Sequence, residues 1–206
     1  MSVKRVIDIL GSILGLLVLS PVLLTGMLLV KVDGGPIFFF QDRLGKDAKV
    51  FRIFKLRTMV LNAEAMLDAQ GRPTGQRITR VGQVLRQTSI DELPQLLNIL
   101  LGTMSLVGPR PILPKMYPHM SDHECDRFKV RPGVTGLAQV KGRNFLKWSR
   151  RFNYDVVYVR RQSFGLDLYI LWLTLFVVVR RSGIAQEVNP GEVNDVSIRP
   201  AIRRPM

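Results

Sequence analysis

A run of 22 uncharged residues, from Ile9 to Val30, constrains the fold of this chain more than any other feature. It consists mostly of Leu, Ile, Val and Gly, and it matches the roughly 20 residues that a helix needs to cross a bilayer. A cleaved signal peptide is the alternative. This run, however, is longer than the usual hydrophobic region of such a peptide, no small-x-small cleavage site closes it, and Pro21 interrupts it. The sequence therefore predicts a membrane helix.

The proline near the middle of this run predicts a bend. Pro21 cannot donate a hydrogen bond to the carbonyl of Leu17, and the Ser20 hydroxyl can compensate by bonding back to a carbonyl. Basic residues flank both ends, with Lys4 and Arg5 before the run and Lys31 and several more after it. Because basic flanks are retained on the cytoplasmic face, the pattern favours a re-entrant helix that enters and leaves by one face. A straight span that exports the N-terminus stays open.

The charge balance indicates an anionic partner. Thirty Lys and Arg stand against sixteen Asp and Glu, which gives a formal net charge of +14, while 47% of the residues are hydrophobic. Such an excess suits a lipid headgroup surface, a phosphorylated substrate or nucleic acid. The single cysteine, Cys125, cannot form an internal disulfide, so nothing requires an oxidising compartment.

The rest of the chain predicts an α+β fold that is predominantly helical. Two short apolar runs around a turn at residues 45–48 indicate a β-hairpin, and a second uncharged run of 12 residues is too short to cross a bilayer, so it is either an interfacial helix or a buried core helix. The expected elements are strands at Phe38–Arg43 and Val50–Lys55, helices at Leu61–Ala69, near Arg86, at Leu93–Leu101 and at Leu168–Val179. The expected organisation is a membrane helix over residues 1–32, a catalytic domain over 33–184, and an extended or poorly ordered tail over 185–206.

Two adjacent acids, Asp91 and Glu92, are the candidate catalytic residues. Ser89 and Glu92 fit a capping box, but Asp91 as N-cap places Pro94 at a position that needs no donor, so both registers stay open. Either register sets the acids at a helix start, where the dipole would keep Asp91 ionised at neutral pH. An ionised, partly desolvated carboxylate is suited to accept a phosphoryl group covalently, and an adjacent acid could share a divalent cation.

Arginines beside turn-forming residues or beside the acidic pair are candidate phosphate ligands, because the guanidinium group binds phosphate in a bidentate manner. For each of them a solvated surface position is the alternative. They are Arg86, Arg110, Arg131 and Arg143.

Several long motifs, in order and spacing from about Lys4 to Ile184, together resemble one family. They are Lys4-Arg5-x-x-Asp8, Ser20-Pro21, Gly35-Pro36-Ile37-Phe38-Phe39, Gln41-x-Arg43-x-Gly45, Phe54 to Met59, Leu85-Arg86, Ser89 to Gln95, Asn98, Ser105 to Pro111, Arg131 to Gln139, Gly142-Arg143-Asn144, Trp148, and Asp155-Val156-x-Tyr158-Val159. The chain resembles the small monotopic phosphoglycosyl transferases, the bacterial sugar transferases that start glycan assembly on undecaprenyl phosphate.

The resemblance implies a helix kinked at Ser20 and Pro21, with the catalytic domain on the cytoplasmic face of the bacterial inner membrane. It implies that Asp91 attacks the β-phosphorus of a UDP-sugar, that UMP leaves, and that polyprenyl phosphate then attacks the aspartyl phosphosugar. Magnesium (Mg²⁺) would be held at Asp91 and Glu92. The residues implied for substrate binding, together with Arg131, are Lys55, Arg57, Arg86, Arg110, Arg143 and Asn144.

Three positions depart from the family pattern. Leu56 stands where an aromatic residue is common, Ala48 where glycine is frequent, and Arg160 where an acid often occurs. None of them belongs to the acidic pair. These departures therefore leave the sugar specificity open, and they do not change the reaction that the resemblance implies.

Two other functions explain less of the sequence. A basic protein that docks on nucleic acid or anionic lipid would account for the charge, but no nucleic-acid-binding motif is present and the acidic pair framed by arginines would have no role. A glycosyl transferase that moves the sugar without its phosphate usually has a nucleotide-binding sheet of parallel strands, and no βαβ alternation is seen.

Overall fold

The computed structural model describes residues 2–68, 74–142, 146–179, 195–196 and 199–202. Its helices are α1 (Val3–Val32), α2 (Arg80–Thr88), α3 (Gln95–Leu100), α4 (Asp122–Cys125), α5 (Leu137–Lys141), α6 (Trp148–Arg161) and α7 (Phe164–Val179), and its strands are β1 (Phe38–Leu44), β2 (Val50–Leu56), β3 (Ser105–Val107) and β4 (Gly133–Thr135). Short 3-10 helices lie at Lys46–Ala48, Ala63–Met66, Ile90–Glu92, Pro114–His119 and Asp126–Lys129. The predicted predominantly helical α+β class is confirmed.

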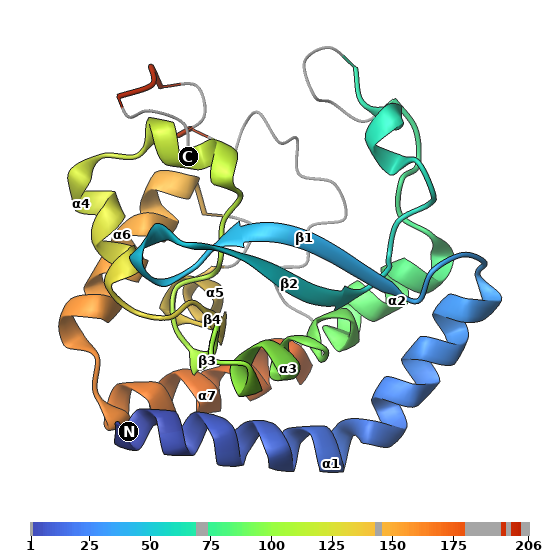
Figure 1. Cartoon of the computed structure of the whole chain (residues 1–206), viewed down its shortest axis with the longest axis horizontal. Coiled ribbons are helices and arrows are strands. Elements are labelled where there is room, and N and C mark those ends of the chain that lie inside the picture. The colour runs from blue at the N-terminus through green and yellow to red at the C-terminus, as the bar shows by residue number, and fades with distance from the viewer. Residues whose placement is uncertain (1, 69–73, 143–145, 180–194, 197–198, 203–206) are drawn as a thin grey trace.

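The long helix α1 contains Pro21 and bends along its length (Figure 1). The Ser20 hydroxyl donates to the carbonyl oxygen of Leu17 at 2.8 Å, so the acceptor that the proline deprives of an N–H donor is satisfied as predicted. Within the described residues, α1 is the one helix that is long and apolar enough to cross a membrane.

Polar contacts attach the N-terminal end of α1 to the rest of the molecule. The buried Asp8 carboxylate accepts hydrogen bonds from the Ser105 hydroxyl at 2.9 Å and from the Leu106 amide at 3.0 Å. Arg5 donates to the carbonyl oxygens of Ile99 and Leu100, which end α3. These contacts fix the start of α1 against β3 and α3.

The C-terminal end of α1 is attached by Arg57, the residue that follows β2. Its buried guanidinium donates to the carbonyl oxygens of Val30 and Gly34 at the end of the helix, and also to those of Pro36 at 2.9 Å and Met59 at 3.1 Å. Both ends of the apolar helix are therefore bonded to the same folded unit.

The predicted hairpin is confirmed, with β1 and β2 antiparallel and Phe38 opposite Leu56. Its turn places Asp47 and Ala48 at a φ of 56°. This left-handed conformation favours glycine, which agrees with the glycine that the family resemblance implied where Ala48 stands. A second pairing, the short parallel ladder of β3 and β4, was not predicted from the sequence.

The predicted helix at Leu61–Ala69 is wrong. Asn62 adopts a φ of 62°, only Ala63–Met66 form a 3-10 helix, and Leu67 is extended. A left-handed residue cannot lie inside a regular right-handed α-helix, so Asn62 interrupts the predicted range and only the single turn after it is helical. The helix expected near Arg86 is α2, and the helix expected at Leu93–Leu101 is α3, which begins at Gln95.

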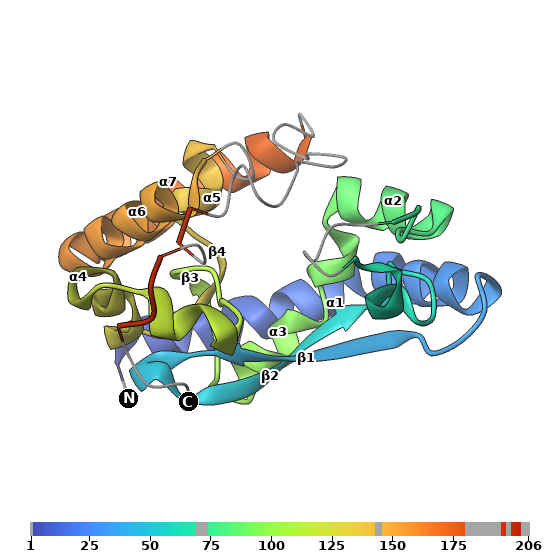
Figure 2. The same ribbon diagram turned by 90° about the horizontal axis from the view of Figure 1, so that it is seen from above.

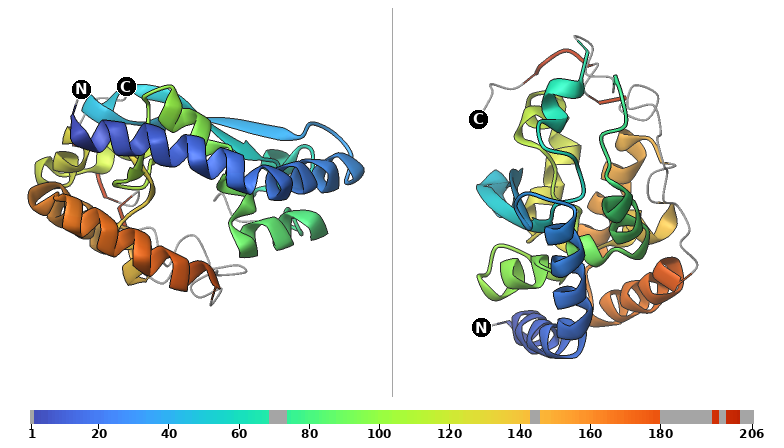
Figure 3. Two further views of the ribbon diagram at one scale, coloured as in Figure 1. Left: turned by 90° about the horizontal axis from the view of Figure 1, so that it is seen from below. Right: turned by 90° about the vertical axis from the view of Figure 1, so that its right-hand side faces the viewer.

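Helices α5, α6 and α7 gather at one end of the molecule and α2 lies at the other, with the hairpin and α1 running between them (Figure 2). Helix α7 buries Ile170 and Asp167, while Phe164, Leu168 and Trp172 are exposed. Asp167 forms an ion pair with Lys4 of α1 at 2.6 Å, and Figure 3 shows α1 and α7 on the same face of the molecule. Two helices with exposed apolar residues therefore lie on one face of the molecule.

The described part of the predicted tail has no helix or strand, but it packs against the domain. Val196 is fully buried in a core cluster with Leu44, Ile112 and Phe152. Asp195 accepts a hydrogen bond from the Ser149 amide, and Arg199 forms an ion pair with Glu124 at 2.9 Å. Within the segment expected as a tail, residues 195–196 and 199–202 therefore take part in the packing of the core.

Candidate active site

The acidic pair lies in a 3-10 turn between two helices rather than at a helix start. Ser89, with a φ of 58°, ends α2, the turn Ile90–Glu92 follows, and Pro94 is the N-cap of α3. Both predicted capping registers are wrong, because the left-handed Ser89 directs the chain out of α2 and neither Ser89 nor Asp91 caps the next helix through its side chain. The turn carries the two acids toward β2.

Glu92 is held by two cations. Its Oε1 accepts from Lys55 Nζ at 2.7 Å and from the Arg110 guanidinium at 2.6 Å. Burial raises the pKa of Glu92, but Arg110 and Lys55 outweigh this effect and hold the pKa well below its ordinary value. Glu92 is therefore ionised throughout the neutral range and orders the positive charges around it.

Asp91 is in the opposite situation. It is only 7% exposed, and its carboxylate accepts no hydrogen bond from any residue that the structure describes. Burial and then the neighbouring Glu92 raise its pKa to about 6, against the opposing effect of Lys55, Arg86 and Arg110. The expectation that a helix dipole keeps Asp91 ionised has no support here, because the three cations are the groups that favour its ionised form.

Two further arginines complete the positive surroundings. Arg86 donates through Nε to the Thr58 hydroxyl at 2.8 Å, and burial lowers its pKa while Asp91 opposes that change. Arg43 bonds Gln41 at 2.6 Å, and burial together with Arg110 lowers its pKa to about 10. Arg43 was not among the predicted site residues, although it lies inside one of the family motifs.

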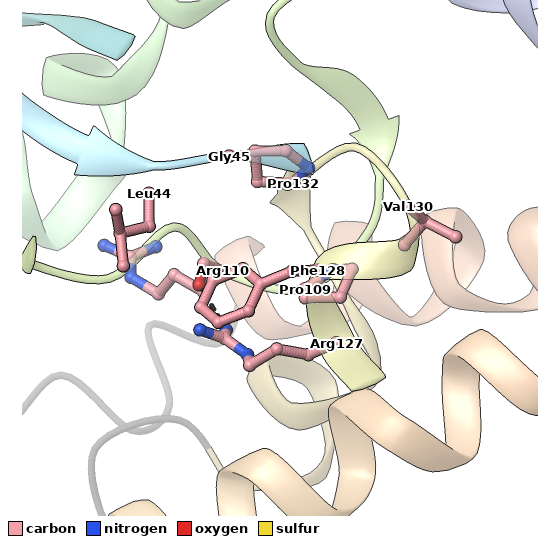
Figure 4. Close-up of a pocket in the computed structure, with 8 residues that line it drawn as sticks. All are labelled: Leu44, Gly45, Pro109, Arg110, Arg127, Phe128, Val130 and Pro132. Atoms are coloured by element: carbon pink, nitrogen blue, oxygen red, sulfur yellow. Dashed lines mark hydrogen bonds between the residues drawn. The ribbon is translucent and has the colours of Figure 1, made fainter. Parts of the chain in front are cut away.

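Arg127, which the sequence did not single out, fixes the segment that carries Arg110. It donates to the carbonyl oxygen of Arg110 at 2.5 Å and forms a buried ion pair with Asp155 at 2.7 Å. Figure 4 shows Arg110 and Arg127 close together beside Phe128, around a cavity of about 10 Å³. Such a cavity holds a single water at most, so it is too small to be the binding site for a nucleotide sugar.

Comparison with known proteins identifies the family. The model of the bacterial sugar transferase family matches residues 1–181. The chain belongs to the bacterial sugar transferase family. The resemblance that the motifs indicated is therefore confirmed, and the chain is an enzyme of the phosphoglycosyl transferase type.

Curated relatives of this sugar transferase differ in length. It is 42% identical to the uncharacterized sugar transferase EpsL of Bacillus subtilis, over 90% of this chain and 92% of that protein. It is 39% identical to the undecaprenyl-phosphate galactose phosphotransferase of Salmonella typhimurium and to the UDP-glucose:undecaprenyl-phosphate glucose-1-phosphate transferase of Escherichia coli. The matches cover 87% and 84% of this chain but only 41% and 39% of those two relatives, so it spans less than half their length.

The sugar transferase brings four of the predicted site residues to Asp91, namely Lys55, Arg86, Arg110 and Glu92. Arg57 lies instead at the end of α1, where backbone carbonyls occupy its guanidinium. Arg131 is exposed and donates to the carbonyl oxygen of Gly102. Arg143 and Asn144 lie outside the described residues.

The donor set of the sugar transferase suits a cation shared with substrate. No group of three or more His, Cys, Asp or Glu residues that could hold a metal occurs in the described part of the chain. Both carboxylates can still accept a cation. No described donor bonds to the Asp91 carboxylate, and Oε2 of Glu92 has only a 3.4 Å contact with Arg110. One or two carboxylates completed by substrate phosphates are the usual protein site for Mg²⁺.

Proposed function

We propose that this enzyme transfers a sugar 1-phosphate from a UDP-sugar to undecaprenyl phosphate and releases UMP. The observation that carries the proposal is the Asp91 carboxylate, which is buried, accepts no hydrogen bond from a described residue and faces three cations. A carboxylate with a pKa near the working pH and without a hydrogen-bond donor is a competent nucleophile. The printed names of the Salmonella and Escherichia relatives support the substrate classes.

In the first step, an oxygen of Asp91 forms a bond to the β-phosphorus of the donor, and the bond from that phosphorus to the bridging oxygen breaks. UMP departs with the electron pair and an aspartyl phosphosugar remains. Lys55, Arg86 and Arg110 compensate the negative charge that gathers on the phosphoryl oxygens. In the second step, a phosphate oxygen of the lipid attacks the same phosphorus and Asp91 leaves as a carboxylate.

Asp91, with a secondary contribution from Glu92, would hold Mg²⁺ in the complex with donor. The ion supplies neutralisation of the diphosphate charge. The positive neighbours of Glu92 restrict it to a supporting role, because Lys55 and Arg110 already share its Oε1.

The decisive experiment identifies the released nucleotide. The enzyme is incubated in membrane vesicles with a panel of UDP-sugars and undecaprenyl phosphate, with and without magnesium. We expect UMP and a lipid-linked sugar diphosphate, and with donor alone a release of UMP stoichiometric with enzyme. Release of UDP would show that the sugar moves without its phosphate and would overturn the proposal.

We infer that α1 is re-entrant and that the domain lies on the cytoplasmic face of the inner membrane, with α7 at the interface. A straight helix of 30 residues is about 45 Å long and exceeds the roughly 30 Å of the hydrocarbon core, so its ends would lie on opposite sides. Both ends bind the same folded unit through Asp8 and Arg57. The bend at Pro21 makes that connection compatible with one membrane face.

Labelling of single cysteines tests this topology. In a Cys125→Ser background, Ser2→Cys and Val60→Cys are each exposed in intact cells to a thiol reagent that does not cross the inner membrane. We expect neither residue to react until the inner membrane is permeabilised. Reaction of Ser2→Cys alone in intact cells would indicate a spanning helix.

The pH dependence of the donor step follows from the two carboxylates. Because only ionised Asp91 attacks, the rate of UMP release should rise as the pH increases through about 6 and then level off. Glu92→Gln removes the like charge that raises the pKa of Asp91, so the rise should move to lower pH even though the maximal rate falls. Single-turnover UMP release between about pH 5 and pH 8 measures this position. A rise that moves to higher pH in Glu92→Gln would contradict the assignment.

A further inference from the structure

The described part of the C-terminal segment, residues 195–196 and 199–202, lies beyond the match to the family model, which ends at residue 181. This C-terminal clamp, coloured red in Figure 2, lies against α4 and the start of α6. The Arg199 guanidinium donates to both carboxylate oxygens of Glu124 at 2.9 Å. The clamp is therefore attached to the folded domain by specific contacts.

Asp195 of the clamp caps the N-terminus of α6. Its carboxylate accepts a hydrogen bond at 3.0 Å from the amide of Ser149, the second residue of that helix. Lys147, at the N-cap position, makes no side-chain bond to the helix. Asp195 therefore satisfies one of the amides that a helix leaves without a partner in its first turn, and its negative charge suits that end of the helix.

Helix α6 in turn is connected to the active-site cation Arg110. Asp155 of α6 accepts two hydrogen bonds from Arg127, at 3.1 Å and 2.7 Å, and Arg127 donates to the carbonyl oxygen of Arg110. The Arg110 guanidinium then bonds to Glu92 at 2.6 Å. A continuous series of contacts therefore leads from the clamp, through α6, to the acidic pair.

Val196 attaches the clamp to the same region by packing. It is fully buried in a cluster that includes Ile112 and Phe152. The Arg127 guanidinium lies 4.7 Å from the ring centroid of Phe152, and Ile112 lies two positions after Arg110 in the chain. The cluster that Val196 completes therefore supports both Arg127 and the segment that carries Arg110.

The charges of the clamp and of the active site also meet at Arg151 of α6. Burial and then Arg110 lower the pKa of Arg151 to about 10, while Asp155 and Asp195 oppose this change. Asp195 and Arg110 thus act on one guanidinium from opposite signs of charge. The clamp is consequently within electrostatic range of the cations that surround the acidic pair.

We propose that the C-terminal clamp positions Arg110 for the diphosphate of the nucleotide sugar, with Asp195 and Val196 as positioning residues. The inference rests on the proposed function, in which Arg110 compensates charge on the phosphoryl oxygens, and it gives a role to a segment beyond the family match. Charge-assisted hydrogen bonds depend on geometry, so a displaced guanidinium binds phosphate less tightly. Loss of the clamp should therefore weaken donor binding while Asp91 still reacts.

Two substitutions of Asp195 test the role of the cap. Asp195→Ala removes the acceptor for the Ser149 amide, whereas Asp195→Asn keeps an oxygen in that place. In Asp195→Ala we expect the UDP-sugar concentration that gives half the maximal rate of single-turnover UMP release to rise about fivefold or more, with the amplitude at saturation retained. Asp195→Asn should recover most of this loss. An unchanged donor dependence in Asp195→Ala would overturn the proposal.

A matched pair of core substitutions distinguishes positioning from a loss of stability. Val196→Ala and Ile99→Val each remove buried carbon from a fully buried residue, but Ile99 belongs to a separate cluster with Ile53, Leu96 and Met104. Both should lower the Tm. Only Val196→Ala should raise the donor concentration for half-maximal UMP release. The same donor dependence in both variants would overturn the proposal, because the clamp would then contribute stability alone.

Binding of UDP provides a measurement that does not depend on turnover. Its affinity is measured by calorimetry for the unsubstituted enzyme, Asp195→Ala, Arg110→Ala and the double variant. We expect Asp195→Ala to weaken UDP binding about fivefold, and to cause no further loss once Arg110 is absent, because the clamp acts through that residue. Additive losses would overturn the proposal. Release of UDP instead of UMP by the unsubstituted enzyme would count against the proposed function, and this cycle would still measure the action of the clamp on Arg110.

Discussion

Replacement of Asp91 by asparagine is expected to lower sugar-phosphate transfer by at least ~10³-fold, because the amide cannot form the covalent intermediate. The variant should remain folded and membrane-bound, since the Asp91 side chain accepts no hydrogen bond from a described residue. The measurement is UMP release with donor alone and with both substrates. Full activity of Asp91→Asn would remove Asp91 as the nucleophile.

The same substitution should stabilise the protein at neutral pH. The folded protein raises the pKa of Asp91 from its ordinary value of 3.8 to about 6, so its ionisation above that pH opposes folding by up to about 3 kcal/mol. Below pH 3.8 Asp91 is protonated in both the folded and the unfolded protein, so the free energy of unfolding has its full value. This contribution is lost as the pH rises through about 6. Thermal melting at neutral pH should therefore give a higher Tm for Asp91→Asn, and the difference should vanish in acid.

Glu92→Gln is the informative control for this stability effect. The folded state lowers the pKa of Glu92 below its ordinary value of 4.5, so its charge stabilises the folded protein at neutral pH and this stability is lost in acid. The amide would also leave Lys55 and Arg110 without their common partner. A Tm that falls in Glu92→Gln and rises in Asp91→Asn would separate the two roles, whereas a fall in both would contradict them.

Arg57→Ala is expected to reduce the free energy of unfolding by at least ~3 kcal/mol. The substitution leaves the carbonyl oxygens of Val30 and Pro36 without the donor that now satisfies them, and it detaches the end of α1 from β2. Arg57→Lys should recover little, because one ammonium group cannot reproduce the planar fork that reaches several carbonyls. Denaturation in detergent or vesicles measures both variants.

Arg52→Ala provides the comparison for Arg57. Arg52 lies on the same strand, but its side chain is 68% exposed and its ion pair with Asp42 is 3.9 Å long. Its loss should change the free energy of unfolding by no more than about 0.5 kcal/mol. If Arg57→Ala instead preserved stability and weakened donor binding, Arg57 would be a phosphate ligand, as the family resemblance implied.

Local patterns predicted the parts of the fold that local forces determine. The Pro21 bend follows from a missing N–H, and the hairpin follows from two apolar runs around a short turn, so both were visible in the sequence. The acidic pair was also a candidate from the sequence, because arginines beside turn-forming residues accompany it.

Prediction from the sequence failed where contacts between distant segments determine the conformation. The capping pattern at Ser89 is a valid local signal, but the chain must turn there to bring Glu92 to Lys55 on β2, and that contact is not encoded nearby. Arg57 was expected to be a phosphate ligand because the family resemblance implied it, and only the fold shows that it donates to the carbonyl oxygens at the end of α1. Arg127 could have been suspected only through its buried pairing with Asp155, 28 positions away.

The attachment of α1 at both ends has a consequence for preparing the enzyme. Deletion of residues 1–32 to obtain a water-soluble fragment would remove Asp8, the acceptor for the Ser105 hydroxyl and the Leu106 amide. It would also expose Leu56 and Leu85, which pack with Val30. We therefore expect the catalytic part of the chain to need α1, and hence a lipid or detergent environment, in order to fold.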